Sequence, residues 1–336
     1  MLRFAPLLES TSRFLRSASM TLRRTFLFLT AGVVLAAPVT AQTTPPKREP
    51  LPATPPDSLR ADLDVVYGQT KEQVLKMDVY RPKAASGPLP ACVLVHGGGW
   101  VKGDKERFRP LAIALAQRGY VVANVEYRLG PVAKYPAAVQ DCSLAVRYVR
   151  AHAAELGADP NRIGAWGGSA GGHLVGVLAG APEYKAFLTE ELAGVSAAVQ
   201  ATCVMAGPTD LTSPSFTEPQ RKKGAESYTF QWLGSHFDDA PGVYREAAPL
   251  THFTRTTGPI LFLTGDQDNP ERDHVAMAKL KTLGVPTDQV VLKDAKHGCW
   301  NQQPWFDQCV DAVDKWFKTY LVAAGAAPGA PVPAGQ

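Results

Sequence analysis

The amino-acid sequence predicts an α/β protein with a mostly parallel central sheet that helices cover on both faces. Its strand-like segments are near-continuous apolar runs, which is typical of parallel strands buried on both faces. Segments with helical spacing separate these runs. Polar and reactive residues follow several runs at their carboxyl ends, where ligands bind in such sheets. The chain has 336 residues, of which 45% are hydrophobic. This suffices for one core of roughly 250–270 residues plus tails.

The expected strands are recognised by their apolar composition. A leading pair at 64–67 and 74–80 precedes the run 91–95, which ends at a glycine triplet. Further strands are expected at 121–125, 163–166, 198–206, 260–264 and 289–292.

Helical spacing connects these strands. In 108–118, Leu111 and Leu115 share one face with neighbouring alanines. The other expected helices run from Pro136 to Gly157, from 173 to 178 and from 304 to 321. The segment 211–249 separates two strands by nearly forty residues. We interpret it as a small helical insertion that forms one wall of a substrate site, with a solvated surface insertion as the alternative.

The N-terminus has the composition of a targeting segment. Arg23 and Arg24 precede an apolar stretch at 26–37 and a small-residue cleavage pattern at 39–41. Residues 1–41 are therefore expected to be a signal peptide, with Met20 as an alternative start of translation. The apolar stretch is too short to span a bilayer, although an uncleaved anchor is the alternative. We expect export to the periplasm or the medium, without stable membrane insertion.

Two further segments lie outside the predicted catalytic domain, residues 58–321. Residues 42–57 are rich in proline and are expected to form a linker. Residues 322–336 lack charge and are expected to be a disordered tail.

The charge balance and the ligand spacing exclude several classes of function. The formal net charge is only +4, and no basic run clusters in the body of the chain, so nucleic acid is not an expected partner. The histidines and cysteines lack paired ligand spacing, so no metal is expected. The glycines at 97–99 lack the lysine of a phosphate-binding loop. No cofactor is predicted.

The five cysteines need an interpretation because export implies an oxidising compartment. Cys92 and Cys203 lie within apolar runs and are expected to be buried thiols. Cys299 and Cys309 either form a bridge that pins the loop between them or remain thiols. Because the count is odd, at least one thiol stays free or pairs with another chain.

Residues 167–171 fit the pattern G-x-S-x-G, with Ser169 at its centre. A strand-like run precedes them and a helical pattern follows, which is the context of a nucleophile elbow. Ser169 is therefore the candidate nucleophile. A serine hydroxyl does not ionise by itself at neutral pH, so this chemistry requires an adjacent base.

The candidate base is His297, because it follows the last strand and Gly298 allows close approach. Asp268 is favoured as the acid that orients the imidazole, since its loop must travel past the strand end to face the histidine. Asp266 and Asp210 are the alternatives, although Asp266 is expected to bond the backbone of its own turn.

Residues 96–100 read His-Gly-Gly-Gly-Trp and supply the complementary part of the site. We expect an oxyanion hole formed by the N–H groups of Gly98, Gly99 and Ala170. The histidine of this run is expected to be structural. Trp100 and Trp300 are candidates for stacking on substrate, with a place in the core as the alternative.

With these motifs, residues 64–321 resemble the α/β-hydrolase superfamily. The run 96–100 is similar to the H-G-G-G motif of the hormone-sensitive-lipase-like esterases, which usually carry Asp where this chain has Gly168. The runs 167–173 and 297–300 look more like the BD-FAE branch of bifunctional feruloyl/acetylxylan esterases. The resemblance implies an esterase that removes acetyl or feruloyl groups from plant polysaccharide fragments.

The sequence thus favours a serine carboxylic-ester hydrolase acting through an acyl-enzyme on a small-molecule or oligosaccharide ester. A general short-chain lipase-like carboxylesterase or an arylformamidase-like amidase is the alternative among hydrolases. A non-catalytic binding module on a hydrolase scaffold is the hypothesis from another class, and it is disfavoured because every expected catalytic position is filled.

Overall fold

The structure, a computed structural model, describes residues 50–322. The predicted signal peptide, the first half of the predicted linker and the predicted tail from residue 323 lie outside these residues. The described residues all belong to the second of the two units into which the chain divides, Lys47–Gln336.

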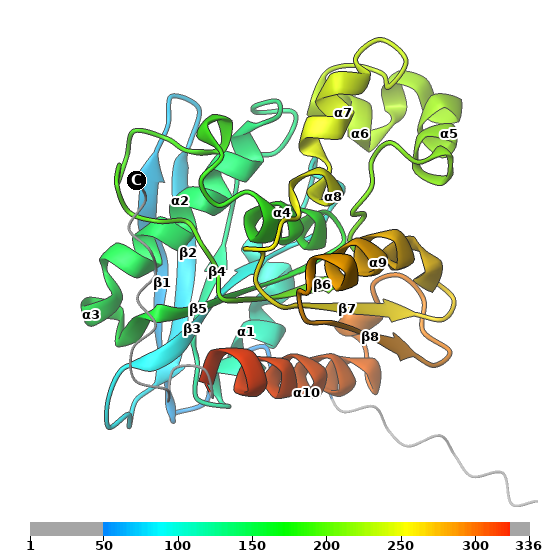
Figure 1. Ribbon diagram of the computed structural model, residues 1–336. Helices are drawn as coiled ribbons and strands as arrows, with labels where there is room; N and C mark the ends of the chain where they lie inside the picture. Colours follow the sequence, from blue (N-terminus) through cyan, green and yellow to red (C-terminus); the bar gives the residue numbers. More distant parts are fainter. Residues whose placement is uncertain (1–49, 323–336) are drawn as a thin grey trace, which may run out of the picture. The chain divides into compact units, whose positions relative to one another are not determined.

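An eight-stranded sheet forms the centre of the described part, with the strand order β1-β2-β4-β3-β5-β6-β7-β8 (Figure 1). The pairs β1–β2 and β2–β4 are antiparallel, and the other neighbouring pairs are parallel. The mostly parallel sheet predicted from the apolar runs is therefore confirmed. The strands are β1 (Leu59–Gln69), β2 (Val74–Pro82), β3 (Leu89–Val95), β4 (Val121–Val125), β5 (Ala158–Gly168), β6 (Ala201–Met205), β7 (Ile260–Gly265) and β8 (Thr287–Leu292).

The ends of several strands differ from the expected ones; β5, for example, begins at Ala158 and not at residue 163. The structure extends β1 well beyond 64–67, although many of its residues are exposed or only half-buried. This edge strand is held by backbone pairing with β2, so its length leaves little apolar signal. The run 198–206 contains β6 but begins three residues before the strand does.

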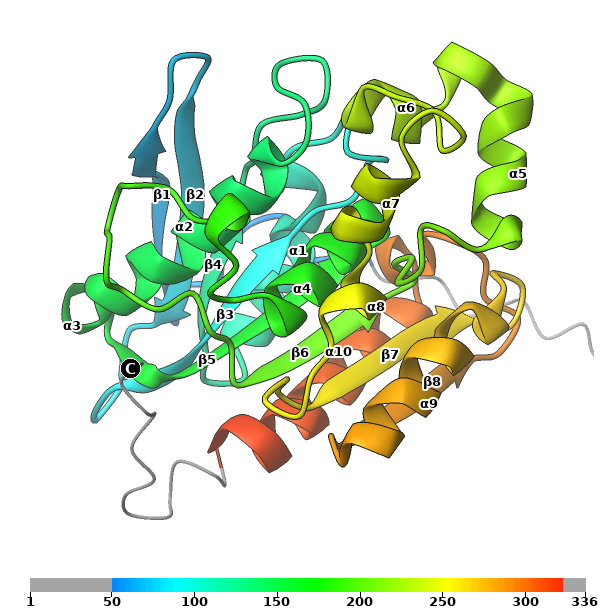
Figure 2. The same cartoon turned by 45° about the horizontal axis from the view of Figure 1, so that its top comes forward.

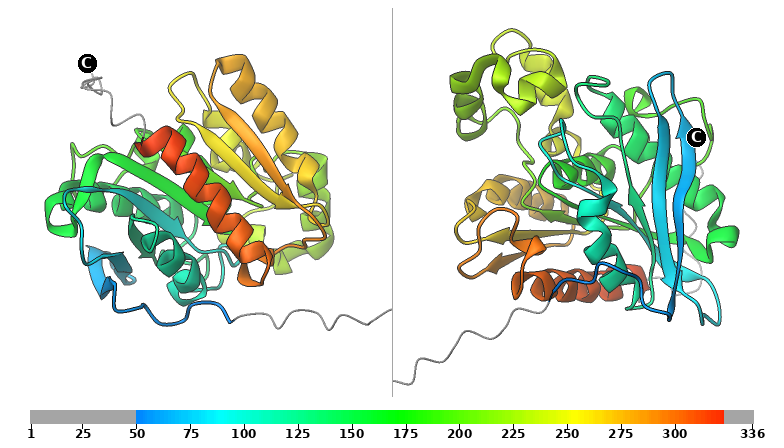
Figure 3. Two further views of the ribbon diagram at one scale, coloured as in Figure 1. Left: turned by 90° about the horizontal axis from the view of Figure 1, so that it is seen from below. Right: turned by 180° about the vertical axis from the view of Figure 1, so that it is seen from behind.

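Helices cover both faces of the sheet, as predicted (Figures 2 and 3). One buried cluster packs α1 (Arg109–Ala116) and α10 (Trp305–Phe317) against the sheet. The other cluster contains side chains of α2 (Ala137–Ala151), α4 (Ala170–Gly180) and α9 (His274–Leu283). The helix expected from Pro136 to Gly157 is interrupted at His152 and continues as the short α3 (Ala153–Leu156). No helix within residues 50–322 combines the length and apolar character needed to cross a bilayer.

The expected helical insertion before β7 is present, and we refer to residues 211–249 as the cap. Its helices group at one end of the sheet in Figures 1 and 2. Trp232 and Tyr244 are buried and join the larger core cluster, so the cap packs on the domain. The cap helices are α5 (Pro214–Lys223), α6 (Tyr228–Leu233) and α7 (Pro241–Ala247), followed by the short α8 (Pro249–His252).

A buried ion-pair cluster fixes the segment that follows the glycine run 97–99. The Lys105 side chain is 6% exposed, and its Nζ lies 3.0 Å from carboxylate oxygens of both Asp64 and Asp78. Asp78 is fully buried on β2, and the side-chain amide of Asn124 on β4 donates to the Lys105 carbonyl at 2.7 Å. Residues of three strands, Asp64 on β1, Asp78 on β2 and Asn124 on β4, therefore anchor the end of this segment.

We predict that Lys105→Met lowers the free energy of unfolding by about 3–5 kcal/mol, because it leaves a buried carboxylate without its main partner. Urea denaturation at neutral pH measures this change. The matched control is Lys71→Met, since Lys71 is exposed and takes part in no ion pair within residues 50–322. Its effect should stay below about 0.5 kcal/mol, and equal effects of the two substitutions would contradict the analysis.

Candidate active site

The turn between β5 and α4 holds Ser169 in a backbone conformation that is rare for a residue with a side chain. Its φ is 56° and its ψ is −121°. Such a conformation costs of order 1–3 kcal/mol and persists only where the surroundings enforce it. The Ser169 N–H donates to the Met205 carbonyl at 2.8 Å, and the Ser169 carbonyl accepts from the His173 N–H at 3.0 Å. This geometry is that of a nucleophile elbow.

Small residues are needed at the elbow because the backbone of β3 passes close to it. A Cβ atom at Gly171 would lie 2.0 Å from the carbonyl oxygen of Val95. Side chains at this position are therefore excluded, which explains the glycine spacing that the sequence shows around Ser169.

The structure brings Ser169, His297 and Asp268 together. The Nε2 atom of His297 lies 2.9 Å from the Ser169 Oγ, and its Nδ1 lies 2.6 Å from the Asp268 Oδ2. His297 is on the loop after β8, and its side chain is 47% exposed, whereas that of Asp268 is 12% exposed. A base within hydrogen-bonding distance of a hydroxyl, oriented by a carboxylate, can activate that hydroxyl as a nucleophile.

A third group, Arg272, holds the other side of the Asp268 carboxylate. Its Nη2 lies 2.5 Å from Asp268 Oδ1, and its Nη1 donates to the Ala206 carbonyl at 3.0 Å. Burial raises the pKa of Asp268, but the hydrogen bond with His297 and the charge of Arg272 together keep this pKa below its usual value. The carboxylate therefore stays ionised at neutral pH. The sequence analysis missed Arg272, because Asp268 precedes the helical turn Pro270–Asp273 and no regular helical spacing connects the two residues.

The two alternative carboxylates bond elsewhere. Asp266 accepts backbone N–H groups from Asp294 at 2.9 Å and Ala295 at 3.2 Å, in the loop that leads to His297. The expectation that Asp266 bonds its own turn is therefore wrong, because the neighbouring loop supplies better-placed donors. Asp210 accepts from the backbone N–H of Thr212 at 2.8 Å and from its hydroxyl at 2.7 Å.

The glycine run 97–99, Ser169 and His297 line one cavity of about 370 Å³, which we call the catalytic cavity. Gly98 has a φ of 132°, and a Cβ there would lie 1.7 Å from the Lys102 carbonyl oxygen. Among residues 50–322, no backbone acceptor takes a hydrogen bond from the N–H of Gly98 or Gly99. Ala170 begins α4, where the N–H has no helical partner. These donors remain the predicted oxyanion hole.

His96 is buried and supports the glycine run from behind. Its Nδ1 lies 2.8 Å from the Gly97 carbonyl oxygen, and its ring stacks on Tyr127 with the ring centres 4.4 Å apart. Burial lowers the pKa of His96 to about 4, so the imidazole is neutral at physiological pH. These contacts agree with the structural role expected for this histidine.

The two tryptophans proposed for substrate contact are both largely buried. Trp100 is 5% exposed, stacks on Trp232 at 4.7 Å, and donates its indole N–H to His173 at 3.2 Å. Trp300 is 4% exposed, lines the catalytic cavity, and lies edge-on to His297 with the ring centres 5.4 Å apart. Both therefore combine a packing role with a surface on a cavity.

The remaining sites considered from the sequence are simpler. All five cysteines are buried free thiols, so the Cys299–Cys309 bridge is not formed in this structure. Within residues 50–322, no cluster of three or more His, Cys, Asp or Glu side chains has the arrangement of a metal site.

Fold and site together define an α/β-hydrolase in which one histidine lies within hydrogen-bonding distance of both a serine and an aspartate. The BD-FAE family model matches residues 77–277, and the chain belongs to this family. The matched region contains Ser169 and Asp268 but ends before His297. The resemblance inferred from the motifs, and the α/β-hydrolase fold that it implied, are confirmed.

The chain is also similar to several known esterases. It is 32% identical to the versiconal hemiacetal acetate esterase of Dothistroma septosporum, over 74% of this chain and 77% of that protein. It is 32% identical to the esterase LipC of Mycobacterium tuberculosis, over 61% of this chain. It spans only about half the length of LipC. Among solved structures, propionate-bound esterase Est2 of Thermogutta terrifontis matches with a TM-score of 0.65 and 26% identity, over 82% of this chain and 97% of that one.

We predict that Asp268→Asn lowers kcat for ester hydrolysis by about 10⁴-fold, because an amide cannot hold the imidazole in the required tautomer. Steady-state kinetics with a chromogenic acetate ester measure the loss. Asp266→Asn is the matched control: it keeps one of the two oxygens that accept from the 294–295 backbone and leaves the contacts of His297 in place, so kcat should fall far less. A larger loss in the Asp266 variant would identify Asp266 as the acid.

Proposed function

We propose that this protein is a serine carboxylic-ester hydrolase that acts through Ser169, His297 and Asp268. The observation that carries the proposal is the pair of contacts on the His297 imidazole, 2.9 Å to Ser169 Oγ and 2.6 Å to Asp268 Oδ2. The named esterases among the relatives support the same class of reaction.

In the proposed reaction, Ser169 Oγ attacks the ester carbonyl carbon while Nε2 of His297 takes the hydroxyl proton. The N–H groups of Gly98, Gly99 and Ala170 stabilise the negative charge on the carbonyl oxygen. The C–O bond to the alcohol then breaks, and the alcohol leaves with the proton from Nε2. Water repeats these steps on the acyl-enzyme and releases the acid. The Asp268 carboxylate remains ionised throughout and stabilises the imidazolium.

For the substrate, we propose acetylated or feruloylated carbohydrate. Membership of the BD-FAE family supports this class, and the predicted export agrees with a polysaccharide substrate outside the cytoplasm. A general short-chain carboxylesterase is the second candidate. Similarity to an esterase solved with propionate and to an acetate esterase supports small acyl groups in either case.

We predict that a fluorophosphonate probe labels the wild-type protein and that Ser169→Ala abolishes labelling, because the probe reacts only with an activated hydroxyl. Intact-protein mass spectrometry measures the added mass. The control is Ser58→Ala, at an exposed serine distant in sequence from Ser169, and this variant should be labelled like the wild type. Wild-type protein that resists the probe would instead favour the non-catalytic binding module.

We predict that the protein releases acid from acetylated xylan and from methyl ferulate as well as from p-nitrophenyl acetate. The measurement is initial rates on these three substrates together with p-nitrophenyl butyrate and octanoate, with Ser169→Ala as the blank. Hydrolysis of octanoate alone would contradict the carbohydrate proposal, and hydrolysis of acetate and butyrate alone would favour the general short-chain esterase.

A further inference from the structure

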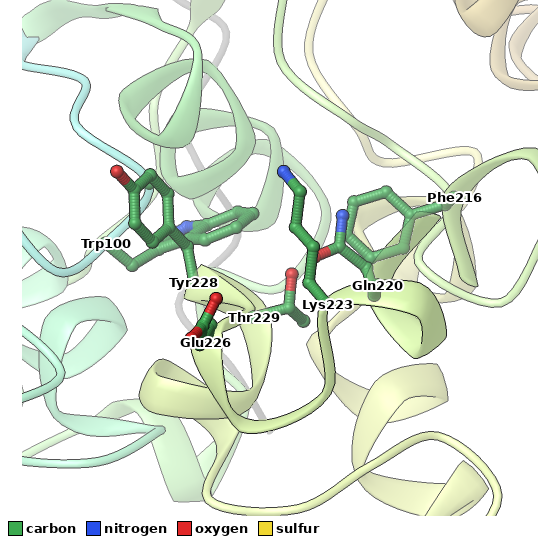
Figure 4. A pocket seen from close by; sticks show the side chains of 8 residues that line it. Trp100, Phe216, Gln220, Lys223, Glu226, Tyr228 and Thr229 are labelled. Carbon is green, nitrogen blue, oxygen red and sulfur yellow. The ribbon is translucent and has the colours of Figure 1, made fainter. Parts of the chain in front are cut away.

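A second cavity of about 340 Å³ lies beneath the cap, beside the catalytic cavity. Figure 4 shows Trp100 and Tyr228 on one side of it and Phe216 and Gln220 on the opposite side. Neither Ser169 nor His297 lines this second cavity, which we call the cap cavity. The proposed reaction assigns it no role.

Tyr228, the first residue of α6, lines both cavities, as does Gly99. Its ring lies directly against the glycine, because a Cβ at Gly99 would be 2.3 Å from the Tyr228 Cδ2. The ring has a second contact: the ammonium of Lys102 lies 5.0 Å from the centre of the Tyr228 ring. The Tyr228 ring is therefore held between the two cavities and against a predicted oxyanion donor.

The start of α6 is fixed well enough to keep this ring in place. Ser227, the N-cap, is buried, and its hydroxyl accepts from the Phe230 N–H at 3.4 Å and donates to Gln220 on α5 at 2.5 Å. One turn later, Trp232 is fully buried and stacks on Trp100. Tyr228 itself is 43% exposed, so a smaller side chain there removes the ring that separates the two cavities and does not create a hole in the hydrophobic core.

The position of His297 indicates which half of an ester the cap cavity receives. The leaving alcohol must take its proton from Nε2 of His297, so it lies on the side of the histidine loop. Gly298, Trp300 and Asn301 of that loop line only the catalytic cavity. The cap cavity adjoins the catalytic cavity at Gly99 and Tyr228, and no residue of the histidine loop lines it, which leaves it for the acyl group.

We propose that the cap cavity is an acyl subsite for flat groups larger than acetyl, and that Tyr228 sets acyl specificity by separating it from the catalytic cavity. This inference rests on the proposed function. The side chains around the cap cavity suit such groups, because Trp100 and Phe216 offer ring surfaces and Gln220 and Lys223 offer hydrogen-bond donors to ring substituents.

The test varies one half of the ester at a time. In the acyl series, p-nitrophenyl acetate, butyrate and benzoate share one alcohol; in the alcohol series, methyl, phenyl and p-nitrophenyl acetate share one acyl group. Tyr228→Ala should raise the ratio of kcat/KM for benzoate to that for acetate by about tenfold, because it joins the two cavities. Tyr228→Phe keeps the ring and is the matched control, so its ratio should equal that of the wild type.

A second variant narrows the cap cavity from the opposite side. Lys223 is exposed on the last turn of α5 and lines the cap cavity but not the catalytic one, so Lys223→Trp should leave the fold intact. It should lower the ratio of kcat/KM for benzoate to that for acetate by about tenfold. This variant tests the proposal even if Tyr228→Ala does not fold.

The alcohol series should not respond to either substitution. A change in that series without a change in the acyl series would make the cap cavity the alcohol subsite and overturn the proposal. Unchanged ratios in both variants, with normal hydrolysis by the wild type, would overturn the acyl subsite alone. Wild-type protein that neither hydrolyses these esters nor reacts with the fluorophosphonate probe would overturn the proposed function, and the acyl subsite with it.

Discussion

The site depends on the close packing of two strand ends, those of β3 and β5. Val95 pairs with Gly167 in the parallel ladder, and the Val95 carbonyl oxygen lies where a side chain at Gly171 would have to be. This contact forces the chain to turn sharply at Ser169 and keeps the left-handed backbone there from relaxing. The same contact sets the oxyanion loop, which leaves β3, beside the nucleophile. The close contact between the backbones of Val95 and Gly171 thus positions both the nucleophile and the oxyanion donors.

The His297 imidazole must reach Ser169 from the loop after β8, the edge strand of the sheet. Three strand spacings separate β8 from β5, or about 14 Å. A residue directly at the end of β8 would therefore lie too far from Ser169. Asp266 bridges part of this gap: its carboxylate binds the N–H groups of Asp294 and Ala295, and the Gln267 N–H donates to the Ala295 carbonyl at 3.0 Å. These bonds hold the start of the loop after β8, from which the chain continues to His297.

Local patterns could be predicted, and so could the meeting of Ser169, Asp268 and His297, because the carboxyl ends of parallel strands share one edge of the sheet. Contacts between individual side chains of separate loops and of the cap could not. The strand 121–125 and the elbow around Ser169 are local patterns, and both were predicted at the observed positions. The partner of Asp266 was predicted wrongly, because its donors lie in another loop. Tyr228 was missed for the same reason. No local motif connects α6 with the glycine run, and the two meet only because the cap folds back over the sheet.

The cap joins the oxyanion loop at two points that differ in burial. Trp232 is fully buried and stacks on Trp100, whose φ of 63° continues the turn of the glycine run. The Trp232 carbonyl accepts a hydrogen bond from the Tyr135 N–H at 3.0 Å. Tyr228, one helical turn earlier, is nearly half exposed. The buried contact transmits the position of the cap to the oxyanion loop, whereas the exposed one shapes the cavity. Residues that select the acyl group can therefore change on α6 while the contact that holds the catalytic geometry stays constant.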